Sequence, residues 1–89
     1  MRLAYLVVHG TTEHEPGVVF EESRSRAKWA AIRAYCEAFN CPTRDAMTGM
    51  SVRRAPRYDS EAAHHVPGWC WSESYIKAAL STDKEHPNG

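Results

Sequence analysis

The side chains of this chain that are best suited to bind a metal belong to three cysteines and two adjacent histidines. Cys36, Cys41 and Cys70, with either His64 or His65, have the right donor types for tetrahedral zinc. Their spacing does not fit a zinc site, because four residues separate the first two cysteines across an expected helix end and no second close pair follows. Cys36 also falls on the expected apolar side of that helix, where cysteine packs as a small hydrophobe. We therefore expect no metal and no other cofactor, with a zinc-stabilised interaction domain as the alternative.

Acid–base and nucleophilic chemistry has little support from the spacing of the other reactive side chains. His9 precedes a glycine after an expected strand, but the chain contains no G-x-S-x-G motif. His14 stands between Glu13 and Glu15 in an expected loop that does not position it. We predict that the protein is not an enzyme, and that no pocket places His9, His14 or a cysteine beside a carboxylate.

Basic side chains concentrate in the middle of a chain whose formal net charge is zero. Residues 24–57 carry seven Arg and one Lys against two acids, a net charge of +6, while the flanking segments are acidic. Such a face could bind nucleic-acid phosphates or an acidic protein surface, or it could be a solvated surface neutralised by the chain's own acids. The candidate binding residues are Arg24, Arg26, Lys28, Arg33, Arg53, Arg54 and Arg57.

Two tryptophans near the C-terminus form a second candidate site. Trp69 and Trp71 are two positions apart, so on an extended segment both side chains point to the same side. They fit either the core of the domain or an interface, where they would stack on bases or form the centre of a protein contact. Exposure of either ring favours the interface.

Two strands, a helix and a third strand are expected to position these residues. Residues 3–8 are apolar on both faces and predict a central strand, followed by a strand over 17–21. A helix over 23–39 comes next, and residues 50–54 predict an edge strand before Pro56. The predicted fold is α+β, with a three-stranded antiparallel sheet in the order 2-1-3 packed on one main helix.

The main helix has recognisable ends and an apparent apolar stripe. Ser23 is the expected N-cap, and Asn40 before Cys41-Pro42 is the expected stop. Steps of three and four residues predict that one stripe packs on the sheet. That stripe consists of Trp29, Ile32, Cys36 and Phe39.

The C-terminal third is expected to be irregular and partly helical. A short helix is expected within 58–65, capped by Asp59 or Ser60, and another runs from a cap at Ser72 to Leu80. We expect this segment to cover the other face of the sheet. Residues 1–80 then form a single domain, and residues 81–89 are a frayed tail.

The cysteine count and the lengths of the apolar stretches limit the cellular compartment expected for this domain. An odd number of cysteines argues against a disulfide framework, and no stretch has the length and apolarity of a membrane span or a secretory signal. We expect a cytoplasmic protein with no membrane partner.

Two stretches, Glu21–Ala31 and Ser51–Asp59, resemble small accessory proteins encoded by bacteriophages and prophages. The expected strand–strand–helix–strand order is also similar to that of some anti-CRISPR proteins, whose family activity is to bind and block a host defence complex. The resemblance implies a non-enzymatic inhibitor that docks on a host protein or nucleoprotein complex through its arginines. The alternative is a small nucleic-acid-binding module that uses the same cations, and a homodimer is plausible because acidic and basic regions can be self-complementary.

Overall fold

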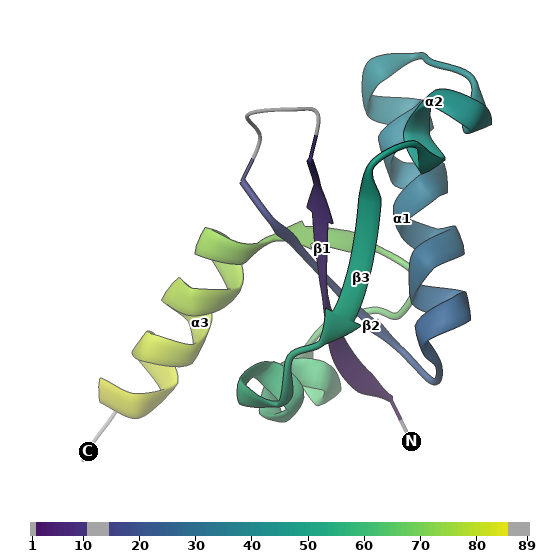
Figure 1. Cartoon of the computed structure of the whole chain (residues 1–89). Helices are drawn as coiled ribbons and strands as arrows, with labels where there is room; N and C mark the ends of the chain where they lie inside the picture. The colour runs from purple at the N-terminus through teal and green to yellow at the C-terminus, as the bar shows by residue number, and fades with distance from the viewer. Residues whose placement is uncertain (1, 11–14, 86–89) are drawn as a thin grey trace.

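Four antiparallel strands form the sheet around which the chain is built (Figure 1). They are β1 (Leu3–His9), β2 (Gly17–Glu21), β3 (Met50–Arg54) and β4 (Cys70–Ser72), and their order across the sheet is β3-β1-β2-β4. The computed structural model describes residues 2–10 and 15–85, with the side chains of residues 2–10 and 15–81. The α+β class, the central position of β1 and the order of the first three strands are as predicted.

The prediction of three strands is wrong, because β4 adds a fourth at the edge of β2. Ser72 lies opposite Gly17 and Trp71 opposite Val18 in this pairing. A strand of only three residues has too short a pattern to be recognised in the sequence. Its partner strand, more than fifty positions earlier in the chain, is what makes it extended.

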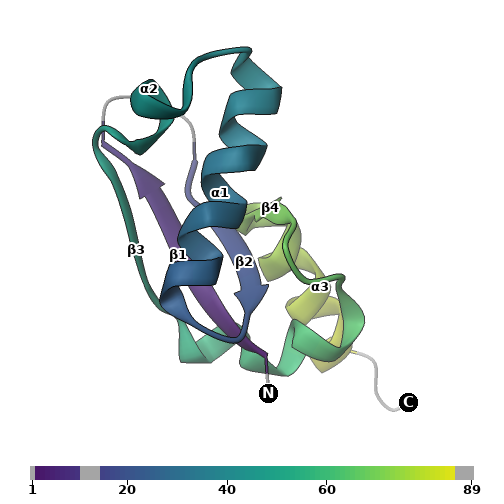
Figure 2. The same cartoon turned by 90° about the vertical axis from the view of Figure 1, so that its right-hand side faces the viewer.

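Helix α1 (Arg24–Phe39) covers one face of the sheet (Figure 2). The Ser23 hydroxyl accepts a hydrogen bond from the Arg26 N–H at 3.2 Å, and Asn40 adopts the left-handed conformation with φ 50° and ψ 48°. Both predicted helix ends are therefore confirmed.

The predicted apolar stripe of α1 is confirmed for Ile32, which is buried, and for Cys36, which packs against the core, but it is wrong for its two aromatic rings. Trp29 is 51% exposed and Phe39 is 45% exposed. Besides Ile32, the buried side chains of the helix are three alanines, Ala27, Ala30 and Ala31. Small alanine side chains let the helix backbone lie close to the sheet, so the larger rings project past the line of contact.

Each face of the sheet has its own core. Tyr5 and Val7 of β1 pack with the buried side of α1, whereas Ala4 and Leu6 point to the opposite face. The opposite core also contains Val18, Phe20, Ala55, Tyr58 and Ile76. The alternation predicted for β1, and the prediction that the C-terminal third covers the second face, are both confirmed.

Three further helical segments complete the chain: α2 (Thr43–Met47), the 3₁₀-helix η1 (Pro56–His64) and α3 (Glu73–Glu85). The Ser72 hydroxyl caps α3 as predicted, accepting from the Tyr75 N–H at 3.3 Å. Asp59 does not cap η1; its carboxylate accepts from the Ala4 N–H of β1 at 2.8 Å. Helix α3 continues beyond Leu80 to Glu85, and the rest of the predicted tail lies outside the described residues. Among the described residues, no helix has the length and apolarity to cross a membrane.

Candidate functional site

The outer side of α1 carries cations that point to solvent. Arg24, Arg26 and Arg33 are exposed and Lys28 is half-buried. Arg26 forms an ion pair with Glu22 one turn away, at 3.1 Å, with both side chains more than half exposed. Pairs of this kind contribute little to stability. The other three make no ion pair with any residue in the described parts of the chain.

Trp29 lies on this same side of the helix. At 3.6 residues per turn, Arg26, Trp29 and Arg33 point in nearly the same direction, and we call these three residues the α1 outer face. They border a shallow hollow that Glu21 and Ser25 complete. Half of the Trp29 side chain is exposed to water there, between two arginines.

Arg54 at the end of β3 is held in a different environment. Its two terminal nitrogens donate to the two carboxylate oxygens of Asp59, at 2.9 and 2.8 Å, and one also donates to the Ala4 carbonyl at 2.7 Å. The guanidinium lies 5.6 Å from the centre of the Tyr5 ring. These hydrogen bonds hold the pKa of Asp59 below its ordinary value of 3.8. Arg54 therefore ties β3, β1 and η1 together.

Arg57 on η1 is also occupied by the fold. It donates to the Glu73 carboxylate of α3 at 3.1 Å and its guanidinium lies 4.6 Å from the centre of the Tyr58 ring. The buried Tyr58 hydroxyl donates to the same Glu73 oxygen at 2.6 Å. The hydrogen bond from Tyr58, and then that from Arg57, lower the pKa of Glu73 from its ordinary value of 4.5.

Arg53 points to yet another side. It pairs with Leu6, whose side chain belongs to the core opposite α1, so Arg53 lies on the sheet face remote from that helix. Arg57 lies on this second side as well, through its contact with α3. The seven candidate cations therefore do not form the single face that the sequence predicts, because alternation along β3 separates Arg53 from α1.

The two candidate tryptophans stand at the edge of the second core. Trp69 is 59% exposed, and its ring centre lies 6.1 Å from that of the half-buried Trp71. Trp71 stacks on Tyr75 at 5.4 Å and lies 5.0 Å from the His65 ring. Its indole N–H is buried and has no hydrogen-bond partner among the described residues. Trp71 is thus part of the core rim, while Trp69 remains on the surface.

The zinc-type residues are dispersed. Cys36 and Cys41 both pack against the core under α1, and partial burial, followed by the neighbouring Cys36 thiol, raises the pKa of Cys41. His65 lies on the opposite side of the sheet, where its Nε2 is 3.2 Å from a Glu61 carboxylate oxygen. His64 is exposed beside it. In residues 2–10 and 15–85, no group of three or more His, Cys, Asp or Glu side chains could hold a metal ion.

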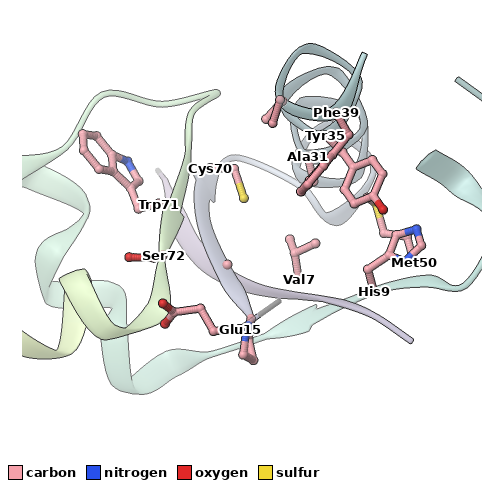
Figure 3. A pocket seen from close by; sticks show the side chains of 14 residues that line it. Val7, His9, Glu15, Ala31, Tyr35, Phe39, Met50, Cys70, Trp71 and Ser72 are labelled. Carbon is pink, nitrogen blue, oxygen red and sulfur yellow. The ribbon is translucent and has the colours of Figure 1, made fainter. Parts of the chain in front are cut away.

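A groove between α1 and the sheet edge is lined by several of the potentially reactive side chains (Figure 3). His9, Glu15 and Cys70 all line it, contrary to the expectation that no pocket combines such groups. The Glu15 carboxylate accepts from the N–H and hydroxyl of Ser74, and it points away from the other two (Figure 3). Burial raises the pKa of Cys70 to about 11, so its thiol is protonated at neutral pH and is a weak nucleophile. His14 lies outside the described residues.

The sequence interpretation missed Trp29 as a surface residue. The signal was present in the spacing, since Arg26 and Arg33 lie three positions before and four after it and therefore on the same helix face. A large ring between two cations on one face indicates a solvent side. The apolar spacing of Trp29, Ile32 and Phe39 predicts the opposite orientation for this ring.

No family model, no curated protein and no solved structure matches this chain.

Proposed function

We propose that this protein is a non-enzymatic binding protein that docks on an acidic surface of another protein through the α1 outer face. The observation that carries the proposal is the half-exposed ring of Trp29 between Arg26 and Arg33. Tryptophan and arginine are among the residue types that most often contribute the largest share of binding energy at protein interfaces. The tryptophan ring fills a pocket, and the guanidinium forms a bidentate pair with a carboxylate.

The charges support an acidic partner. Arg33 has no acidic partner among the described residues, and Arg26 has only the exposed Glu22. A carboxylate on a partner protein would bind both without breaking a contact that holds the fold. An interface of about 800 Å² on each side is the usual size for a stable complex. The chain exposes 5738 Å², so such an interface covers a small share of it.

The partner class follows from the resemblance to small phage proteins. We propose a host macromolecular complex, of the defence type, that is inhibited because the bound domain occupies a surface the complex needs. Inhibition by occupancy requires a rigid exposed surface and no catalytic group. The capped helix α1, packed on the sheet through Ala27, Ala30 and Ala31, is such a support.

Nucleic-acid binding is the second candidate, and one observation favours it. An exposed Trp29 could stack on a base while Arg26 and Arg33 contact phosphates. Arg53 and Arg57 lie on the other side of the sheet and cannot extend that contact. The nucleic-acid candidate predicts an affinity that falls steeply with salt, in proportion to the phosphates contacted.

Two charge reversals test the proposal with a built-in control. Arg33→Glu changes the α1 outer face, and Arg53→Glu makes the same change in charge on the opposite face, also at an exposed residue. Affinity capture from a bacterial lysate should recover the same protein with wild type and Arg53→Glu, and lose it with Arg33→Glu and with Trp29→Ala. Equal recovery with all four proteins would contradict the proposal.

A salt titration with labelled single-stranded and duplex nucleic acid separates the two candidates. We expect no binding at physiological salt. Tight binding that is lost with Arg33→Glu, and whose salt slope corresponds to several phosphates, would replace the protein partner by nucleic acid.

A further inference from the structure

Two of the three cysteines lie together at the C-terminal end of α1. Cys36 belongs to the last turn of the helix, and Cys41 follows the left-handed residue Asn40. A left-handed residue reverses the chain at a helix end, and the residue after it commonly contacts the side chain five positions earlier. In this chain those two positions are occupied by Cys41 and Cys36.

The packing and the hydrogen bonding of the two side chains agree with this geometry. Both pack against one core cluster, which also contains Ile32 and Ala46. The two thiols are joined by a hydrogen bond, so the sulfur atoms are neighbours. Neither cysteine is in a disulfide, and each is half-buried, so part of each residue is open to solvent. A dissolved reagent can therefore reach a pair of thiols that are already in contact.

We propose that Cys36 and Cys41 are a redox-active dithiol, which a small disulfide such as oxidised glutathione converts to an intramolecular disulfide. The new bond joins the last turn of α1 to the segment that leads into α2. In a reducing compartment, protein disulfides are usually transient and serve catalysis or redox sensing. The inference does not depend on the proposed docking function, because no residue of the α1 outer face takes part in it.

The oxidation consists of two thiol–disulfide exchanges. One protein thiol loses its proton, and its thiolate attacks a sulfur of oxidised glutathione. A mixed disulfide forms, and one glutathione thiolate leaves. The second protein thiolate then attacks the protein sulfur of the mixed disulfide, and the second glutathione thiolate leaves. The protein loses two protons and two electrons, which reduce one oxidised glutathione to two glutathione thiols.

The surroundings of Cys41 influence this exchange. Partial burial, then the Cys36 thiol and finally the Asp45 carboxylate raise the pKa of Cys41. A protonated thiol is a weak nucleophile, so attack by Cys41 is slow at neutral pH. A low thiol pKa stabilises the reduced form of a dithiol and makes its disulfide easy to reduce. Cys41 lacks that stabilisation, so its disulfide is not favoured for reduction in this way.

Cys70 provides an internal control. Burial raises its pKa to about 11, and neither of the other thiols contributes to that shift. Its sulfur points into the space between β4 and α1 (Figure 3). Cys70 therefore lies outside the pair, and in the folded protein it should not take part in the disulfide.

Oxidation of the folded full chain by oxidised glutathione, followed by intact-mass and peptide mass spectrometry, tests the assignment. Wild type and Cys70→Ser should both lose about 2 Da and contain one internal disulfide, between positions 36 and 41. Cys36→Ser and Cys41→Ser should each stop at the mixed disulfide, with one glutathione bound. The absence of an internal disulfide in wild type, or a disulfide that includes Cys70, would overturn the proposal.

The wild-type chain alone covers the case in which a variant fails to fold. Oxidation in urea exposes all three thiols, so disulfides that include Cys70 should appear there and be absent from the folded protein. The same mixture of pairings under both conditions would overturn the proposal.

Phenylarsine oxide, which binds two neighbouring thiols at once, tests the contact without oxidation. One molecule per chain should bind to wild type and to Cys70→Ser, at least about tenfold more tightly than to Cys41→Ser. Equal affinities for Cys70→Ser and Cys41→Ser would contradict the pairing of Cys36 with Cys41.

Discussion

Arginines on helix α1 and arginines that contact η1 or α3 differ in what surrounds them. On α1, Arg33 points to solvent and Arg26 has only an exposed partner one turn away. On the β3–η1 side, Arg54 holds Asp59 through two hydrogen bonds and also a backbone carbonyl, and Arg57 reaches Glu73 of α3. The first group is exposed and holds no elements of the fold together, whereas the second joins elements of the fold.

The difference shows that a run of cations in a sequence does not identify a binding face. Asp59 follows Arg54 by five positions and Glu73 follows Arg57 by sixteen, and only the fold brings each acid to its arginine. A binding arginine is one whose charge the chain leaves unmatched. Structural arginines should therefore affect stability when they or their acids change, and arginines of the α1 outer face should affect binding.

The sharpest stability contrast is between the two carboxylates that pair with arginine. Asp59→Asn should lower the free energy of unfolding by about 1–2 kcal/mol, because Asp59 receives charged hydrogen bonds from β3 while partly exposed. Glu22→Gln should change it by about 0.3 kcal/mol, as for other exposed pairs one helical turn apart. Urea denaturation of both variants measures the two values. Equal losses of unfolding free energy in the two variants would contradict the difference proposed between these ion pairs.

The next contrast removes single hydroxyl groups. Tyr58→Phe should cost about 1 kcal/mol of unfolding free energy, since the buried Tyr58 hydroxyl donates to Glu73 at 2.6 Å. Tyr75→Phe is the matched control at a ring that is 51% exposed, and we expect almost no change. Thermal unfolding followed by circular dichroism compares them, and a Tyr58→Phe variant as stable as wild type would contradict the role assigned to this contact.

Lowering the pH should reduce the stability that the ion pairs of Arg54 and Arg57 contribute to the fold. The folded-state pKa values of Asp59 and Glu73 lie below their ordinary values of 3.8 and 4.5. Their contribution is therefore complete above those ordinary values, and it is lost as the pH falls through the lowered ones, because the unfolded chain binds the protons first. The pH dependence should become shallower in Asp59→Asn than in wild type. Urea midpoints between neutral pH and about pH 3 provide the test.

The smallest expected stability change belongs to the α1 outer face. Arg33→Glu should leave the free energy of unfolding within about 0.5 kcal/mol of wild type, as for surface changes away from any structural contact. The same variant should weaken partner binding about tenfold or more. A variant that loses stability in the urea experiment would place Arg33 with the structural arginines instead.

Local chemistry made part of the fold predictable from the sequence. The caps at Ser23 and Ser72, and the left-handed stop at Asn40, are signals carried by single residues and their neighbours. The two apolar faces of β1 likewise indicated a central strand with cover on both sides. These features depend on contacts that the residue pattern itself implies.

The remaining features depend on contacts between distant segments. Strand β4 exists through its pairing with β2, and the side that α1 presents to the sheet is formed by three alanines and Ile32 rather than by Trp29 and Phe39. The candidate site was the least predictable part from the sequence. The ion pairs that distinguish Arg54 and Arg57 from the α1 cations form only when the chain folds. The surface position of Trp29 was accessible from the spacing of Arg26 and Arg33.

Site-specific photo-crosslinking tests the central claim, that the α1 outer face is the contact surface, most directly. p-Benzoylphenylalanine placed at position 25, where the exposed Ser25 borders the same hollow as Trp29 and both arginines, should give a discrete cross-linked product in a bacterial lysate. Excess unlabelled wild type should compete with it, and the Arg33→Glu variant should not. The same probe at position 53, on the opposite sheet face, should give no such product. Cross-linking from position 53 but not from position 25 would contradict the account.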